Sequence, residues 1–313
     1  MVFRQPGKVL TAFLSVILSL VLVEAYLRFH PVNEFKADTS SNIAKVAGWG
    51  PSGCLPTHAF ENTQHKIRIL LMGDSELDCN NGTQPYENTI SYILQKMLGP
   101  KYEVITIAAG GWGTDQEYLA YEAEGKKYKP DYTLVLFTPA NDIYNNWSHT
   151  AVGSDAPKPY WDHLRQTFVW DKQTTAWHWW QRTQIYKRFV PRKDDPQAQT
   201  ASFLLEWPES IVEGWDATQE ILWRWGYPTV VYVPTGMYLD RCYGYEEPSL
   251  PEYNIMQPYF HMKEFSQRTG FALIDDIDFV KRMDIRNITY DCTHMSKLGS
   301  ALLAGKVYDF LKK

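Results

Sequence analysis

The feature that most constrains the fold of this 313-residue chain is an alternation of short apolar segments with segments of helical periodicity, from residue 66 onward. The apolar segments predict strands at 66–72, 102–108, 131–137, 228–233 and 272–274. The periodic segments predict helices at 89–98, 115–124, 210–225, 252–269 and 295–311. Parallel neighbouring strands need crossover connections, which helices supply. The pattern therefore predicts an α/β fold with a parallel sheet covered on both faces.

Three polar or glycine positions each follow the end of an expected strand. Ser75 follows the first strand, Gly111 the second and Asn141 the third. In sheets of this kind, functional groups collect at the carboxyl ends of the strands. We therefore expect these three residues to lie together.

Ser75 ends a Gly-Asp-Ser sequence, and Asp291 and His294 stand three positions apart near the end of the chain. A serine hydroxyl is a poor nucleophile unless a histidine takes its proton and a carboxylate orients that histidine. We predict Ser75 as the nucleophile, His294 as the general base and Asp291 as the orienting carboxylate. The alternatives are that Ser75 caps a helix, that His294 is an ordinary loop histidine and that Asp291 is a turn residue. Asp74 and Asp142 are expected to brace their loops by hydrogen bonds.

A tetrahedral oxyanion needs hydrogen-bond donors aimed at it. Gly111 could supply a backbone N–H, because glycine lets the chain approach the reacting carbon closely. Asn141 could supply its side-chain amide. The alternatives are a tight turn in which Gly110 or Gly113 is the relevant glycine, and an Asx-turn at Asn141.

Together, these four blocks resemble those of the SGNH hydrolases, also called GDSL esterases/lipases, in residue type and in order. The blocks are Gly73-Asp74-Ser75, Gly111, Asn141-Asp142 and Asp291-x-x-His294. The resemblance covers roughly residues 66–313. It implies a flavodoxin-like three-layer α/β/α domain in which Ser75, Gly111 and Asn141 jointly donate to the oxyanion.

The sequence Gly-Trp-Gly-Thr-Asp-Gln, which begins at Gly111, resembles the membrane-anchored, exported branches of that family. Two positions depart from the family pattern. Pro139 stands where the asparagine block usually opens with glycine, and Thr106 stands where asparagine is frequent. The first departure could alter the backbone of the loop, and neither removes a proposed catalytic side chain.

The N-terminal segment predicts a membrane anchor. Arg4 and Lys8 precede an apolar stretch from residue 9 to residue 27, which is long enough to cross a bilayer. We assign residues 1–29 as a signal anchor or transmembrane helix and residues 30–65 as a linker, which places the remainder outside the cytoplasm. A cleaved signal peptide would make the protein secreted, and a buried helix is the other alternative.

An aromatic-rich insertion is expected at about residues 144–201, after the third strand. One interpretation is a substrate-facing lid or a platform on which sugars stack. The other is that its tryptophans form a small core of their own or lie near the membrane interface. The formal charge of −5 and the lack of a basic stripe argue against nucleic-acid binding.

Four cysteines, Cys54, Cys79, Cys242 and Cys292, show no Cys-x-x-Cys spacing of the kind that binds metals. In an exported protein they could form two disulfides with three possible connectivities. A bond between Cys79 and Cys292, each close in sequence to a candidate catalytic residue, is one hypothesis.

These features predict a membrane-anchored, extracytoplasmic serine esterase that works through an acyl-enzyme and needs no metal or organic cofactor. The expected substrate is a short acyl ester, such as an O-acetyl group on a glycan. The alternatives are an O-acyltransferase acting on a cell-envelope polysaccharide, a lipase or lysophospholipase, and a non-catalytic envelope assembly protein. The last should have lost a member of the triad, and none is missing.

Overall fold

The computed structural model describes residues 15–23, 25, 43, 47, 58–78, 85–148, 158–162, 164–170, 202–243 and 254–313. The chain divides into two units, and the sheet belongs to the unit made of residues 36–171 and 196–313. In the other unit, residues 15–23 are helical. None of the helices described here combines the length and the apolar character needed to span a bilayer. Most of the predicted anchor at 1–29 lies outside the described residues.

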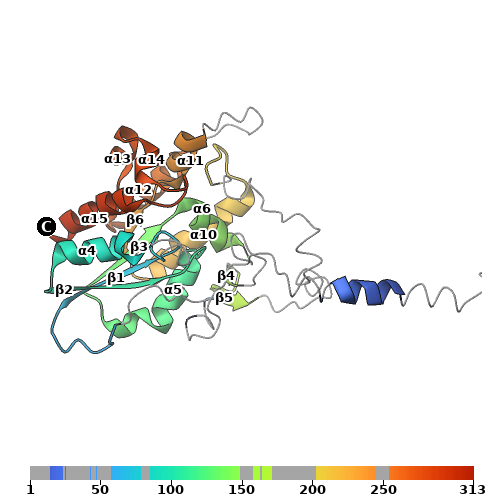
Figure 1. The fold of residues 1–313 in the computed structure, drawn as a ribbon, viewed down its shortest axis with the longest axis horizontal. Helices are drawn as coiled ribbons and strands as arrows, with labels where there is room; N and C mark the ends of the chain where they lie inside the picture. Colours follow the sequence, from blue (N-terminus) through green and yellow to red (C-terminus); the bar gives the residue numbers. More distant parts are fainter. Residues whose placement is uncertain are drawn as a thin grey trace, which may run out of the picture. The chain divides into compact units, whose positions relative to one another are not determined.

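A five-stranded parallel sheet forms the centre of this unit (Figure 1). Its strands are β1 (Ile67–Gly73), β2 (Tyr102–Ala108), β3 (Tyr132–Phe137), β6 (Thr229–Tyr232) and β7 (Leu273–Asp275). They lie in the order β2-β1-β3-β6-β7. Counting these five strands alone, the order is 2-1-3-4-5, that of flavodoxin-like sheets, whose ligand crevice lies between the first and third strands. The predicted α/β fold with a parallel sheet is confirmed.

Helices connect the strands in sequence. They are α4 (Ile90–Leu98), α5 (Thr114–Ala123), α6 (Pro139–Trp147), α10 (Glu209–Arg224), α11 (Thr235–Tyr243), α12 (Gln257–Thr269), α13 (Ile277–Arg282), α14 (Ile285–Ile288) and α15 (Lys297–Leu311), with the 3-10 turns η1 (Tyr86–Asn88) and η2 (Gly125–Tyr128). The sequence pattern did not predict α6, α11, α13 and α14. Each of these four is short, and two of them begin directly after a strand, where we expected only loops.

The two faces of the sheet are covered by different helices. Ile69 and Leu71 of β1 belong to the same buried cluster as residues of α4 and α15. Leu70 and Met72, on the opposite face, belong to a second cluster with Ala120 of α5. Because successive side chains of a strand point to opposite faces, this division shows that β1 is buried on both sides. Figure 1 shows α4 and α15 on one side of the sheet and α5 on the other.

The segment expected to be an aromatic insertion is partly regular. Its first residues, 144–147, are the last turn of α6. Strands β4 (Pro159–Asp162) and β5 (Thr167–Trp170) then form a two-stranded antiparallel sheet. Trp161 of β4 is buried against Ala217 and Ile221 of α10, so this tryptophan serves a local core. The remaining tryptophans of 171–201 lie outside the described residues.

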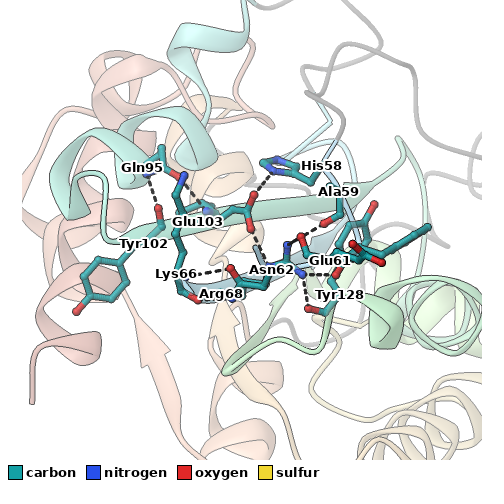
Figure 2. A network of polar contacts seen from close by, with 12 residues as sticks. His58, Ala59, Glu61, Asn62, Lys66, Arg68, Gln95, Tyr102, Glu103 and Tyr128 are labelled. Atoms are coloured by element: carbon teal, nitrogen blue, oxygen red, sulfur yellow. Dashed lines mark hydrogen bonds and ion pairs between the residues drawn. The ribbon is translucent and has the colours of Figure 1, made fainter. Parts of the chain in front are cut away.

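Arg68, near the amino-terminal end of β1, binds the segment 59–61 that precedes the sheet (Figure 2). Its guanidinium is 2% exposed and donates to the carbonyl oxygens of Ala59, Phe60 and Glu61 at 2.8, 2.6 and 3.2 Å. It also pairs with the Glu103 carboxylate at 2.7 Å. Arginine has five N–H donors and satisfies several acceptors at once. The packing of residues 59–61 therefore depends on one buried side chain.

Replacing Arg68 by methionine should lower the free energy of unfolding by about 3 kcal/mol, because it leaves Oε2 of Glu103 and several carbonyl oxygens without their donor. Equilibrium urea unfolding followed by tryptophan fluorescence measures this. Arg165→Met is the matched control, since Arg165 is 69% exposed where it pairs with Asp162 and its loss should leave the urea midpoint unchanged. Equal effects of the two substitutions would contradict the role given to Arg68.

Candidate active site

The structure brings Ser75, His294 and Asp291 into hydrogen-bond contact. The Oγ atom of Ser75, two residues past the end of β1, lies 2.9 Å from Nε2 of His294. The other ring nitrogen of His294, Nδ1, lies 2.7 Å from Oδ2 of Asp291. This is the order of contacts in which a carboxylate holds the ring and the ring faces a hydroxyl. The roles of the three residues remain predictions.

A short loop before α15, residues 289–295, carries Asp291 and His294 and is called the histidine loop below. It closes where Thr289 pairs with Met295 in an antiparallel bridge. Inside the loop, Oδ1 of Asp291 accepts the backbone N–H groups of Thr293 and His294 at 3.0 and 2.7 Å. Burial alone would raise the pKa of Asp291, but these bonds and the His294 ring outweigh it and hold the pKa below its usual value. An ionised Asp291 keeps the proton of the ring on Nδ1 and leaves Nε2 free to accept the proton of Ser75.

Gly111 lies in a tight turn after β2. The Trp112 N–H donates to the Ala109 carbonyl oxygen at 3.1 Å, which makes Gly111 the third residue of a β-turn. Its φ of +73° is the conformation that favours glycine at that position. In the described part of the chain, the backbone N–H of Gly111 and that of Ser75 donate to no acceptor. Both are therefore available to a ligand oxygen.

Asn141 lies in the first turn of α6, directly after β3. Pro139 opens this helix, and its fixed φ suits the first helical turn. The departure from the family pattern at Pro139 is thus accommodated by a helix start. The Asn141 Nδ2 donates to Oδ2 of Asp74 at 2.6 Å, and the same nitrogen carries a second N–H. Asp142 accepts the Thr138 N–H at 2.6 Å, so both aspartates brace the loops as predicted.

Two further acidic side chains next to Ser75 bind other site loops, and the sequence patterns did not predict them. Oε2 of Glu76 accepts the backbone N–H of Met295, the neighbour of His294, at 2.9 Å. Oδ2 of Asp78 accepts the backbone N–H of Gly110, the neighbour of Gly111, at 2.8 Å. Glu76 thus joins the turn at Ser75 to the histidine loop, and Asp78 joins the turn at Ser75 to the turn at Gly111.

Asp74, Glu76 and Asp78 therefore form a set of alternate acidic residues around Ser75, and each binds a different loop of the site. All three are buried. The signal that could have identified them is the spacing itself. Three carboxyl groups two residues apart, directly after an apolar strand, are unusual in a buried turn because an unpaired buried charge is costly.

Burial also changes the protonation of carboxyl groups around the site. Burial, followed by the nearby Asp74 carboxyl, raises the pKa of Glu76 well above its usual range. Burial and then Asp142 do the same to the pKa of Glu117, whose two carboxyl oxygens have no hydrogen-bond partner among the described residues. Burial and the neighbouring Asp275 raise the pKa of Asp276 to about 7. The raised pKa values favour the neutral forms of these groups, and a neutral carboxyl group does not oppose an oxyanion.

A disulfide joins Cys242 at the end of α11 to Cys292 in the histidine loop. The hypothesis of a bond between Cys79 and Cys292 is therefore wrong, because Cys292 is already paired. Cys54 and Cys79 lie outside the described residues. The pair is separated by 50 residues, and closing a loop of that length in the unfolded chain corresponds to about 4 kcal/mol of stabilisation in the chain-entropy account.

Within the described ranges, no group of three or more His, Cys, Asp or Glu side chains is placed to hold a metal ion. The chemistry that this arrangement offers is that of a serine hydroxyl, an imidazole and a carboxylate, with backbone and amide N–H groups nearby.

No protein-family model and no curated protein matches the sequence. Solved structures similar to the chain include an acetyl xylan esterase, AlAXEase, with 16% identity, a TM-score of 0.44, and coverage of 78% of this chain and all of that one. The lipase/acylhydrolase from Enterococcus faecalis has 15% identity, a TM-score of 0.42, and coverage of 78% and 95%. A GDSL-like lipase from Bacteroides thetaiotaomicron has 9% identity, a TM-score of 0.43, and coverage of 82% and 92%. A likeness at such identities does not establish a shared activity.

The contacts of Glu76 and Asp78 predict how their substitutions differ. Alanine at either position leaves a buried N–H without an acceptor and should lower the free energy of unfolding by about 1–3 kcal/mol. Glu76→Gln and Asp78→Asn keep an oxygen acceptor and should cost less than the matched alanine variants. Urea unfolding of the four variants measures this, and an amide variant as destabilised as its alanine counterpart would contradict the assigned contacts.

Proposed function

We propose that this protein is a serine hydrolase that cleaves acyl esters through an acyl-enzyme. The single observation that carries the proposal is the 2.9 Å contact between Ser75 Oγ and His294 Nε2, with Asp291 on the other ring nitrogen. A hydroxyl becomes a competent nucleophile when a base stands within hydrogen-bond reach and is itself oriented by a third group.

The reaction proceeds in two halves. Ser75 Oγ attacks the ester carbonyl carbon while its proton passes to His294 Nε2, and the imidazolium is stabilised by Asp291. His294 then returns the proton to the leaving alcohol as the tetrahedral intermediate collapses to an acyl-serine. In the second half, water attacks the acyl group, His294 takes one of its protons, and the carboxylic acid departs as Ser75 is reprotonated.

The developing oxyanion is stabilised by the N–H groups of Ser75 and Gly111 and by the amide of Asn141. Two observations support this assignment: the N–H groups of Ser75 and Gly111 donate to no acceptor among the described residues, and the Asn141 amide has a second hydrogen. Asp74 fixes the Asn141 amide, and Asp78 holds Gly110 beside Gly111. Donors held in place before the reaction stabilise the transition state without the cost of reorganisation.

The proposed substrate is a short acyl ester, such as an O-acetyl group on a glycan of the cell envelope. Its support is the proposed location outside the cytoplasm and the aromatic composition of residues 144–201. An O-acyltransferase would use the same acyl-enzyme but pass the acyl group to a sugar hydroxyl instead of water. A lipase would prefer long acyl chains.

The full chain in mild detergent should hydrolyse p-nitrophenyl acetate, and Ser75→Ala and His294→Ala should each lose at least about a thousandfold in kcat/KM, because the three residues act as a unit. Ser266→Ala is the matched control, since this hydroxyl of α12 donates to the backbone carbonyl oxygen of Phe271, just past the end of the helix. Equal hydrolysis by wild type and Ser75→Ala would refute the proposal. A rate that rises with acyl length would indicate a lipase, and acetylation of an added sugar would indicate a transferase.

We also propose that residues 1–29 anchor the protein in a membrane with the α/β domain outside the cytoplasm. The basic residues before the apolar stretch support this orientation, and so does the Cys242–Cys292 disulfide, because such bonds persist in oxidising compartments. The protein should sediment with membranes and resist carbonate extraction. Protease added to the outer side of intact cells or spheroplasts should digest residues 66–313, and protection of this region would contradict the orientation.

A further inference from the structure

The disulfide enters the histidine loop at an unusual point. Cys292 stands between Asp291 and His294 and has a φ of +66°, a left-handed conformation that residues other than glycine rarely adopt. Such a conformation persists where the surrounding structure imposes it. Cys292 is joined to Cys242, and their Cα atoms lie 5.7 Å apart.

The tip of the histidine loop, residues 291–293, makes few contacts with the rest of the protein. The hydrogen bonds of Asp291 go to Thr293 and His294, inside the same loop. At the base, Met295 donates to Glu76 and pairs with Thr289. Within the described part of the chain, residues 291–293 make no other hydrogen bond, ion pair or disulfide to residues beyond the loop, apart from the bond to Cys242. Asp291 is 40% exposed at its side chain, so solvent competes for its hydrogen bonds.

The other end of the disulfide is firmly placed. Met237 and Tyr238 of α11 are buried in the main core, and the Tyr238 hydroxyl donates to Asp276 at 3.4 Å. A Cβ added to Gly236 would lie 2.6 Å from the ring of Phe203, which shows how closely the start of α11 is packed. Because Cys242 belongs to this helix, the disulfide connects an exposed loop tip to the core.

We propose that the Cys242–Cys292 disulfide positions Asp291, and through it His294, against Ser75. The proposal rests on the proposed esterase function and deepens it by assigning the two cysteines as positioning residues that touch no substrate. Without the bond, the loop keeps its base at Glu76 but its tip gains freedom, so His294 faces Ser75 for a smaller fraction of the time. This loss affects the chemical step more than substrate binding.

The test uses the full chain and three variants, Cys242→Ala, Cys292→Ala and the double variant. Each breaks the same bond, so all three should lose about tenfold to a hundredfold in kcat on p-nitrophenyl acetate with KM within about twofold of wild type. The losses should not add in the double variant, which distinguishes the shared bond from two independent side-chain effects. Hydrogen exchange of residues 289–296 should show reduced protection at Thr293 and His294 in all three variants, whatever their activity.

Arg68→Met is the control for general destabilisation, because Arg68 lies at the amino-terminal end of β1. It should leave both kcat and the exchange of residues 289–296 unchanged. Three outcomes would contradict the positioning role of the disulfide. They are unchanged exchange in the cysteine variants, the same change of exchange in Arg68→Met, and failure of all three cysteine variants to fold. Failure of the proposed esterase function would be recognised separately, because wild type and Ser75→Ala would then hydrolyse p-nitrophenyl acetate equally. In that case the exchange measurement alone tests whether the disulfide positions the histidine loop.

Discussion

The hydrogen bonds of the turn from Asp74 to Asp78 hold the other site loops around Ser75. Asp74 binds the side chain of Asn141, Glu76 the backbone beside His294, and Asp78 the backbone beside Gly111. This turn follows strand β1 at the point between β1 and β3 where the strand order of the sheet reverses. The three carboxyl groups therefore reach loops that are distant in sequence. The geometry of the candidate site therefore depends on one short turn whose own position is fixed by strand β1.

This arrangement has an electrostatic consequence. Several carboxyl groups are buried near a centre at which a negative charge would develop, and the burial of an unpaired charge is costly. Burial raises the pKa of Glu76 and Glu117, which favours their neutral forms. Asp291, by contrast, has a pKa below its usual value, because backbone N–H groups and His294 stabilise its charge. Of these three carboxyl groups, only Asp291, the one that faces the imidazole, has surroundings that favour its charged form.

The sequence predicted the sheet well, because buried parallel strands are continuous apolar segments. The strand expected at 102–108 has those bounds, and the parallel direction of the strands follows from their alternation with helices. The order of the strands was implied only by the family resemblance. Ser75, Asp291 and His294, predicted from residue type and spacing, lie in contact. Helix α6 was not predicted, because its nine residues include a proline and three asparagines, which are poor helix formers. The contact between Glu76 and Met295 spans 219 residues, and neither this contact nor the pairing of Cys242 with Cys292 leaves a local signal in the sequence.

The central claim is that Ser75 is activated as a nucleophile by His294. Its most direct measurement is the site of covalent modification by a fluorophosphonate, which phosphonylates an activated serine. Peptide mass spectrometry of the labelled wild-type protein should locate one phosphonyl group on Ser75, and His294→Ala should prevent its formation. An adduct on another serine, or labelling of Ser75 that persists without the imidazole, would contradict the account.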